Sequence, residues 1–354
     1  MSEKRYVSST DVARLAGVSQ SAVSRTFTEG ASVSHGTREK VLAAARTLGY
    51  RPNFLPQALL SNRSRLVAVA VGAVTNPFYA SVLEQFTAAL QDAGQQVVLI
   101  QIASDYALDT VLDRIAGYRV DALVSALAVL SPDTARALSE LRIPVVCFNG
   151  RIRAEWVSSV SLDNLAAGAE AADHLHRAGG RRFAFVSGPP GSPATKDRRA
   201  GFARRLRTLR MGAPLLLPGD YSYEGGLAAA LRVMRADPRP DAVACANDLS
   251  ALGLLDGFRR AGLRSPEDVL VLGYDNIGMD NWAPYELSSF DQNVPEMIRR
   301  TLRLILDDDA AEEARRGVLE KVPARLVARR TTARPGQAAV RGHGGPPSAP
   351  RRAS

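Results

Sequence analysis

The chain has 354 residues, 46% of them hydrophobic, which is enough for two or three domains. No apolar run reaches the roughly 18–20 residues that span a bilayer, and the polar start MSEKRYVSST does not resemble a signal peptide. We therefore expect a cytoplasmic protein without a membrane segment. Cys147 and Cys245 each fall in an apolar run, so we expect buried thiols rather than a disulfide or a metal pair.

The positive charge of the chain is placed unevenly. Residues 1–65 hold ten lysines and arginines against four acids, and residues 334–354 hold four arginines and no acid. Residues 66–333 hold 31 basic and 32 acidic side chains, so this body is close to neutral. A basic head on a neutral body suits a protein whose head meets phosphate.

Residues 9–28, STDVARLAGVSQSAVSRTFT, predict a helix, a tight turn and a second helix. Two helices that cross steeply need a small residue at their contact, here Ala13, and a turn residue with free dihedral angles, here Gly17. Val23 would seal the pair from the second helix. A third helix over about 37–48 follows, with an expected inner face of Val41, Leu42, Ala45 and Leu48.

The ends of these helices carry capping residues. Ser8 can cap the first helix, with Asp11 at capping-box spacing, and Ser19 can cap the second. The outer face of the second helix is polar and free to meet a partner, which favours a DNA-reading helix-turn-helix over a plain helical bundle. Its side chains are Gln20, Ser21, Ser24 and Arg25.

After a proline-containing linker with one brief helix near 53–60, apolar and amphipathic stretches alternate. Strands are expected at 66–74, 96–102, 121–127, 143–148, 182–186, 241–246 and 269–274. Helices are expected at 78–93, 164–178, 195–210, 223–235 and 249–261, and 157–162 reads as a crossover. This alternation predicts two α/β lobes with parallel sheets and a cleft between them. The arginine-, proline- and glycine-rich tail from residue 334 is expected to be disordered.

From about residue 7 to 331 the sequence resembles the LacI/GalR family of transcriptional regulators. The resemblance rests on DVARLAGVS and VSR in the head, TREKVLAAARTLGYRPN after it, and NPFY behind the first strand. It continues through IPVV, HLHRAGGRRFAFVSGP, RRAGF, ADPRPDAVACANDLSALGLLDGFRRAGL and PEDVLVLGYDN, in the family's order. This many motifs in one order are far more specific than any one of them.

The resemblance implies an all-α helix-turn-helix head, a hinge, and a periplasmic-binding-protein-like α/β core of two Rossmann-like lobes with three crossovers. The implied boundaries are 1–51 for the head, 52–65 for the hinge, 66–331 for the core and 332–354 for a basic tail. Lobe one would comprise 66–162 and 291–318, and lobe two 163–290 and 319–331.

The resemblance also implies a two-fold dimer on a pseudo-palindromic operator, with the second helix in the major groove. The base-reading positions are then Gln20, Ser21 and Arg25, while Ser19 and Ser24 match phosphate contacts. Asn53, at the start of the hinge, is a further expected DNA contact, and Leu59 matches the leucine that wedges into the minor groove. Pro56 departs from the family's usual alanine and disfavours a helical residue before it.

In the core, the resemblance implies a small effector bound in the cleft, either an inducer or a corepressor. The matching positions are hydrogen-bonding groups and apolar walls that suit a sugar, or alternatively a nucleoside. They are Phe78, Asn149, Arg198, Tyr221, Asn247, Asp275 and Gln292. Asn149 replaces the aspartate common at its position, and Asn247 and Asp275 could equally act as turn or cap residues.

Two other classes of protein, an enzyme and a solute-binding protein, fit the sequence less well. An enzyme is disfavoured because residues 188–196 lack phosphate-loop spacing and no GxGxxG, HExxH or GxSxG occurs, so no cofactor and no metal are expected. A solute-binding protein of transport would suit the core alone. The head and the missing signal peptide argue against it.

Overall fold

The structure is a computed structural model that describes residues 7–28, 30–51, 63–72, 75–102, 112–126 and 132–333. It divides into two compact units between Ser64 and Arg65, a head and a core, each of which is described by itself. The predicted site residues Asn53 and Leu59, together with Pro56 and the tail from residue 334, lie outside the described residues.

The head consists of α1 (Ser9–Ala16), α2 (Gln20–Phe27) and α3 (His35–Leu48), as predicted. Its core is formed by Val12, Ala13 and Val23 with residues of α3. The expected inner face of α3 was wrong at Leu42, which is exposed, whereas Ala44 is buried. Successive helical residues point about 100° apart, so the stripe through Val41 and Ala45 includes position 44 and excludes position 42.

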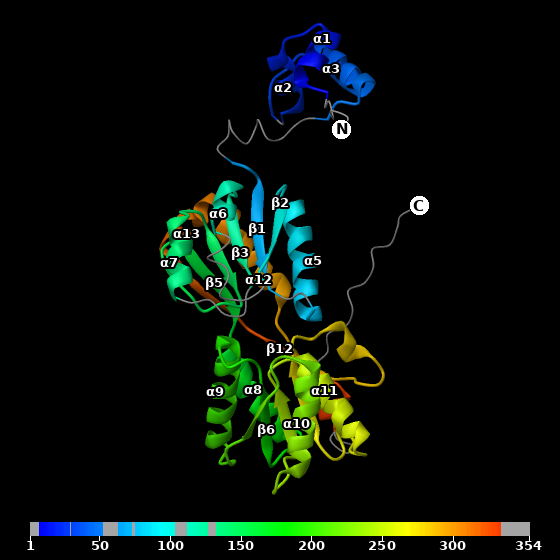
Figure 1. Ribbon diagram of the computed structural model, residues 1–354, viewed down its shortest axis with the longest axis vertical. Coiled ribbons are helices and arrows are strands. Elements are labelled where there is room, and N and C mark those ends of the chain that lie inside the picture. The colour runs from blue at the N-terminus through cyan, green and yellow to red at the C-terminus, as the bar shows by residue number, and fades with distance from the viewer. Residues whose placement is uncertain are drawn as a thin grey trace, which may run out of the picture. The chain divides into compact units, whose positions relative to one another are not determined.

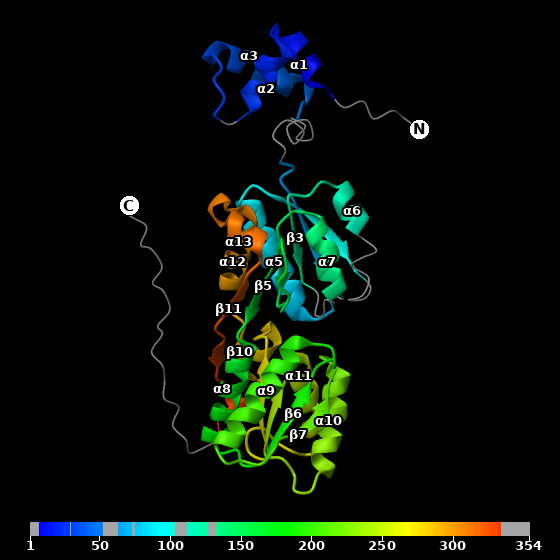
Figure 2. The ribbon, with the colours of Figure 1, turned by 90° about the vertical axis from the view of Figure 1, so that its left-hand side faces the viewer.

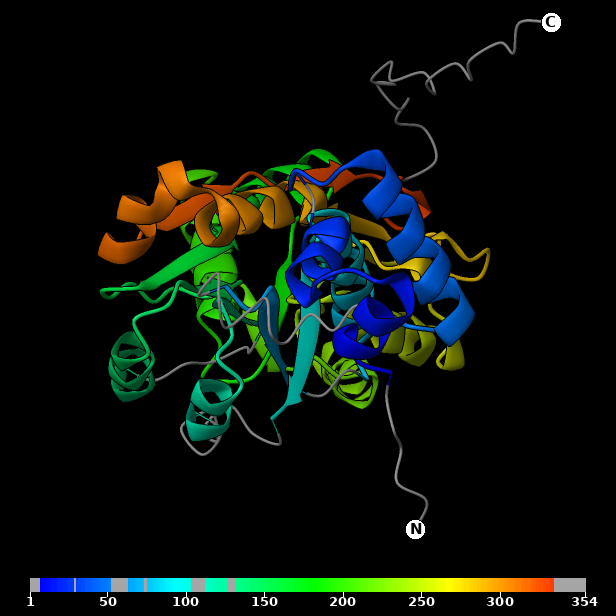
Figure 3. The ribbon, with the colours of Figure 1, turned by 90° about the horizontal axis from the view of Figure 1, so that it is seen from above.

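The first lobe of the core is a six-stranded parallel sheet covered on both faces. Helices α5 (Pro77–Asp92) and α12 (Val294–Leu306) pack on one face. Helices α6 (Leu112–Gly117) and α7 (Pro132–Glu140) lie on the other (Figures 1 and 3). The strand order is β11 (Leu319–Val322), β5 (Val157–Leu162), β4 (Val145–Phe148), β3 (Ala122–Ser125), β1 (Leu66–Val71) and β2 (Gln96–Gln101).

The second lobe repeats this plan, with one antiparallel strand at an edge. Helices α8 (Asn164–Arg177) and α9 (Pro193–Thr208) cover one face of its sheet. Helices α10 (Tyr223–Arg235) and α11 (Asp248–Arg260) cover the other (Figure 2). The order is β12 (Arg325–Val327, antiparallel), β10 (Ser288–Asp291), β9 (Leu270–Tyr274), β8 (Ala242–Cys245), β6 (Phe183–Ser187) and β7 (Leu215–Pro218). Cys147 and Cys245 are buried free thiols, as predicted.

Three boundaries differ from the prediction. The segment 157–162 is not a bare crossover but strand β5, which pairs with β4 and β11 before the chain crosses. Residues 319–322, assigned to lobe two, form β11 in the first sheet, and Asp291, assigned to lobe one, ends β10 in the second. Backbone hydrogen bonding decides which sheet each strand joins. The sequence of a short strand of mixed polarity, such as LEKV, does not indicate which strand it pairs with.

The predicted tail also begins too early, because Thr332 belongs to the core. Its hydroxyl lies 2.7 Å from Nε2 of His174 and 2.7 Å from the hydroxyl of Ser288. Burial, reinforced by the nearby Arg177, lowers the pKa of His174 to about 4, so this imidazole is neutral at pH 7.

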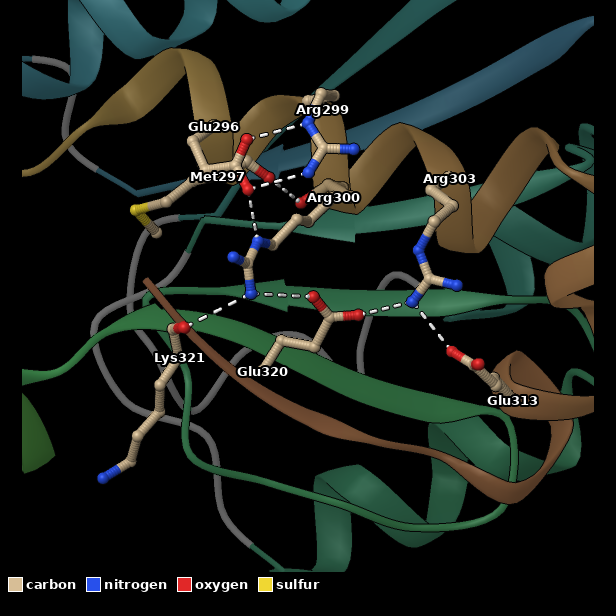
Figure 4. Close-up of polar contacts among 9 residues, drawn as sticks. Glu296, Met297, Arg299, Arg300, Arg303, Glu313, Glu320 and Lys321 are labelled. Carbon is tan, nitrogen blue, oxygen red and sulfur yellow. Dashed lines mark hydrogen bonds and ion pairs between the residues drawn. The ribbon is translucent and has the colours of Figure 1, made fainter. Parts of the chain in front are cut away.

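An ion-pair network holds β11 against α12 and α13 (Ala311–Arg316), as Figure 4 shows. Glu320 of β11 accepts hydrogen bonds from Arg303 at 2.6 Å and Arg300 at 3.3 Å, both on α12. Arg303 also binds Glu313 of α13 at 2.7 Å. Hydrogen bonds from Arg299 and Arg300 lower the pKa of Glu296 to about 2. The network therefore fastens the strand that precedes the third crossover.

Helices α8 and α9 approach each other at two glycines. A Cβ atom on Gly168 or on Gly201 would lie 2.1 Å from a backbone oxygen of the facing helix. Gly226 and Gly253 make the same kind of contact between α10 and α11, at 2.1 and 2.0 Å. Such spacing has no room for any side chain, so glycine is required at all four positions.

We predict that Gly168→Ala destabilises the protein by about 1–3 kcal/mol, because the added methyl group forces α8 and α9 apart. Denaturant unfolding of the core measures this. The matched control is Gly212→Ala in the same lobe, where an added Cβ meets nothing within 4 Å. Equal stability of the two variants would contradict the close helix contact.

Candidate functional site

The turn between α1 and α2 is built by two caps and a left-handed glycine. Ser8 and Asp11 form the predicted capping box, and the side chain of Ser19 accepts a hydrogen bond from the backbone of Ala22. Gly17 ends α1 at φ +66°, a conformation that glycine adopts at little cost. These local interactions fix where α2 begins and therefore which side chains it exposes.

The five described residues predicted to meet DNA are all exposed. They are Ser19, Gln20, Ser21, Ser24 and Arg25. Gln20 donates to the hydroxyl of Ser9 at 2.9 Å, and Nε of Arg25 donates to the backbone oxygen of Ser21 at 3.3 Å. These bonds leave one amide end and most of a guanidinium free on the same helix. That surface is suited to the edges of bases.

In the core, all seven residues predicted for the effector line one cleft between the lobes. The cleft is narrow and leaves about 30 Å³ between its walls, far less than the several hundred Å³ of a typical ligand pocket. A ligand of sugar size enters only if the lobes separate or wall side chains turn. Four further residues line the cleft that the sequence did not predict: Asn76, Tyr79, Ser192 and Ala194. The NPFY motif could have indicated Asn76 and Tyr79, and the N-cap of α9 could have indicated Ser192.

A relay of amides crosses the cleft. Nδ2 of Asn149, at the end of β4, donates to Oε1 of Gln292 at 3.0 Å. Nε2 of Gln292 donates in turn to Oδ1 of Asp275, which follows β9, at 2.6 Å. Oδ1 of Asn149 is buried and accepts no hydrogen bond from any described residue. This oxygen can therefore accept a hydrogen bond from a ligand in the cleft.

The carboxyl group of Asp275 lies in an environment that disfavours its charge. Burial raises its pKa well above the ordinary value, and the carboxyl of Asp248 raises it further. The guanidinium of Arg198 and the hydrogen bond from Gln292 oppose this effect. Such a site suits a neutral ligand that donates hydrogen bonds better than it suits an anion.

Arg198 is buried beneath the cleft and held on three sides. Its Nε donates to Oδ1 of Asn164 at 2.7 Å, and its Nη1 donates to the backbone oxygen of Ala246. Its guanidinium carbon lies 4.4 Å from the centre of the Tyr274 ring. These contacts fix the plane of the guanidinium, and its other N–H groups are available to a ligand.

Asn247 and Tyr221, two of the predicted residues, make hydrogen bonds that hold the cleft wall together. Asn247 caps α11 by accepting from Ser250 at 3.2 Å and donates to the backbone oxygen of Tyr221 at 3.1 Å, so both ends of its amide are engaged. The hydroxyl of Tyr221 is held by Ser192 at 2.8 Å and Thr195 at 2.7 Å. The Tyr221 ring is thereby fixed as a flat wall.

Phe78 supplies a second apolar wall. It opens α5, where its backbone N–H donates to the capping side chain of Asn76 at 3.0 Å. The Phe78 ring meets the ring of Tyr79 edge to face, with centroids 5.3 Å apart. Together these rings offer apolar surface opposite the polar groups of the second lobe.

The turn that presents Asp275 is strained and held from the C-terminal side. Asp275 has φ +123° and Asn276 φ +54°, both in the region that favours glycine. Arg329, which follows β12, donates to Oδ1 of Asn276 at 2.6 Å, to Oδ1 of Asn281 at 3.0 Å and to the backbone oxygen of Leu287 at 2.7 Å. Arg329 thus braces the turn that carries a cleft residue.

Behind this turn lies a pair of buried carboxyl groups that the sequence analysis did not identify. Asp248 accepts from the hydroxyl of Ser289 at 2.7 Å and from the backbone N–H of Ile277 at 3.2 Å. Asp280 is also buried, and neither of its carboxyl oxygens has a hydrogen-bond partner among the described residues. Burial and the neighbouring charge of Asp248 raise the pKa of Asp280 far above its ordinary value, so Asp280 keeps its proton at neutral pH.

We predict that Asp280→Asn stabilises the protein increasingly as the pH rises. Above its ordinary pKa, Asp280 is ionised in the unfolded chain and protonated in the folded one, which lowers the stability of the wild type. The advantage of the variant should grow by about 1 kcal/mol or more between pH 5 and pH 8. Unfolding free energies at the two pH values measure it, and a pH-independent difference would contradict the raised pKa of Asp280.

Comparison with known proteins agrees with this architecture. Residues 10–53 match the family model of bacterial regulatory proteins, lacI family, and residues 172–332 match that of the periplasmic binding protein-like domain. The transcriptional regulator CelR of Thermobifida fusca is 33% identical over 306 residues, which cover 84% of this chain and 90% of CelR. The chain belongs to the LacI family.

Solved structures of the family extend the similarity to nearly the whole chain. A CelR–cellobiose complex is 31% identical with a TM-score of 0.69, and covers 92% of this chain and 99% of its own. The lac repressor dimer bound to operator and the anti-inducer ONPF is 26% identical with a TM-score of 0.81, and covers 93% and 99%. This LacI-family protein is a DNA-binding transcriptional regulator, and the alternative of a solute-binding protein is not favoured.

Among the described residues, no helix is both long and apolar enough to cross a membrane. Within the same residues, no group of three or more histidine, cysteine, aspartate or glutamate side chains is arranged to hold a metal ion.

Proposed function

We propose that this regulator is a cytoplasmic homodimeric repressor that binds a pseudo-palindromic operator. Its affinity for the operator falls or rises when a small sugar binds between the lobes. The observation that carries this proposal is the cleft, which brings all seven predicted residues together, with Arg198 and Asp275 among them. Operator binding by a related dimer and cellobiose binding by CelR support it.

For the head, we propose that α2 enters the major groove. Arg25 would pair with guanine and Gln20 with adenine, with Ser21 beside them, while Ser19 and Ser24 would contact phosphates. Asn53 and Leu59 keep the roles that the resemblance implies, a hinge contact and a minor-groove wedge. Two heads on one operator multiply the discrimination that one small head provides.

We predict that Arg25→Ala lowers operator affinity about ten- to hundredfold, because a bidentate contact to guanine is worth about 1–3 kcal/mol. A fluorescence titration with duplexes from the DNA beside the protein's own gene measures this. Arg46→Ala is the matched control, since Arg46 is an exposed cation of the same head on α3. Equal losses in the two variants would mean that Arg25 contributes only charge.

For the core, we propose a neutral, polyhydroxylated effector. Oδ1 of Asn149 lacks a donor among the described residues, and the surroundings of the Asp275 carboxyl disfavour its charge. The guanidinium of Arg198 is held in a fixed orientation and can donate two parallel hydrogen bonds. Vicinal hydroxyl groups satisfy all three, and the rings of Phe78 and Tyr221 suit the apolar face of a sugar ring. A nucleoside is the alternative, since its base could stack on the same rings.

We predict that Arg198→Lys lowers effector affinity about tenfold or more and leaves operator affinity without effector unchanged, because lysine lacks the planar fork. Thermal shifts with a sugar panel and a nucleoside panel identify the ligand first, and titration then compares the variants. The control is Arg199→Lys, the exposed neighbour on the same helix. A shift with a nucleoside and with no sugar would replace the carbohydrate by the alternative.

A further inference from the structure

Helix α9 is strongly basic, although the core as a whole is nearly neutral. Its sequence PATKDRRAGFARRLRT holds six basic residues and one acid. Arg198 is buried in the cleft wall, and Arg205 binds Asp173 at 2.7 Å. The remaining four cations are exposed on one side of the helix and define what we call the cationic face: Lys196, Arg199, Arg204 and Arg207.

The cationic face is not neutralised by the part of the chain that the structure describes. None of its four side chains makes a hydrogen bond or ion pair with the residues that the structure describes, and the helix's one acid, Asp197, binds Arg151 at 2.9 Å. On α12, by contrast, Arg299, Arg300 and Arg303 all bind carboxylates, as the dashed lines of Figure 4 show. The arginines of α12 are therefore neutralised within the described residues, whereas the four cations of α9 are not.

An apolar groove of about 570 Å³ runs beside the cationic face. Lys196 and Arg199 form one wall, and Pro190, Leu216 and Pro218 provide apolar surface. Asp220 also lines the groove but forms no ion pair with any described residue. A groove with an apolar floor and a cationic wall suits a ligand that is both apolar and anionic.

The groove exists because α9 covers β6 but not the whole of β7. In the register of the sheet Leu216 lies beside Phe185, and the Phe185 ring packs on Phe202 of α9. Leu216 lies one strand further out, at the edge of the sheet, and stays 48% exposed. Within the described residues no strand pairs with the outer edge of β7, so its backbone groups face outward.

We propose that the cationic face and this groove form a docking site for an acidic, extended segment of a partner protein. The four cations span about 17 Å along α9, the length of about five extended residues. Alternate side chains of such a segment would place carboxylates on the cations and apolar groups on Leu216 and the prolines.

The apolar floor distinguishes this partner from a nucleic acid. Phosphate groups would use the cations alone, and Leu216 and the two prolines would contribute nothing to that binding. A protein segment uses both halves of the surface. The docking site lies on the outer face of α9, while the effector residue Arg198 lies on its inner face, so the two sites use different surfaces of one helix.

The test uses the full chain and a fluorescein-labelled hexapeptide of alternating glutamate and leucine, with anisotropy as the readout. Charge reversal in Lys196→Glu with Arg199→Glu should weaken binding about tenfold or more, and so should Arg204→Glu with Arg207→Glu. Arg232→Glu with Arg235→Glu is the matched control, because these exposed cations lie on α10, on the opposite side of the sheet. This control should change the affinity less than about twofold.

Two control peptides separate charge from apolar contact. Replacing glutamate by glutamine, or leucine by serine, should each abolish most of the binding, and Leu216→Ser should weaken the binding of the original peptide. Equal losses in the α9 and α10 variants, or tight binding of the glutamine peptide, would overturn the proposal. A selective loss of affinity for non-specific duplex DNA in the α9 variants would assign the face to nucleic acid instead.

Discussion

The hydrogen bonds of Gln292 are the constraint on which the cleft depends. Gln292 lies just after β10, where the chain passes from the second lobe to the first, and its amide binds Asn149 on one side and Asp275 on the other. The acceptor end and the donor end are both used, so the orientation of the amide is fixed. Moving the lobes apart must break at least one of these bonds. A ligand that replaces them therefore changes the balance between lobe arrangements.

Helix α9 links the two surfaces of the second lobe. Its close contact with α8 at Gly168 and Gly201 sets its depth against the sheet, which places Arg198 under the cleft. The same placement turns Lys196 and Arg199 outward beside Leu216. One helix position therefore determines both the polarity of the cleft wall and the charge of the outer face.

Much of this could be predicted because the relevant signals are local or follow from parallel sheets. Ser8, Asp11 and Gly17, which set the two ends of α1, lie within nine positions of one another, so the helices of the head could be predicted. Asn149, Asn247 and Asp275 each follow a strand, and the carboxyl ends of parallel strands meet at one edge. The failure at 319–322 came from a strand whose partner, β5, lies far away in the sequence. The pair of Asp248 and Asp280 was missed for the same reason, since 32 positions separate them.

The sequence by itself determined the helix-turn-helix and the alternation that makes two α/β lobes, because periodicity and capping are written in neighbouring residues. Its resemblance to the family pointed to seven of the residues that line the cleft. Only the tertiary structure decided what those residues do there. It engaged both ends of the Asn247 amide, left Oδ1 of Asn149 without a donor among the described residues, and braced the strained turn at Asp275 with Arg329. Hydrogen bonds and burial depend on groups brought together from distant segments, and no local pattern encodes them.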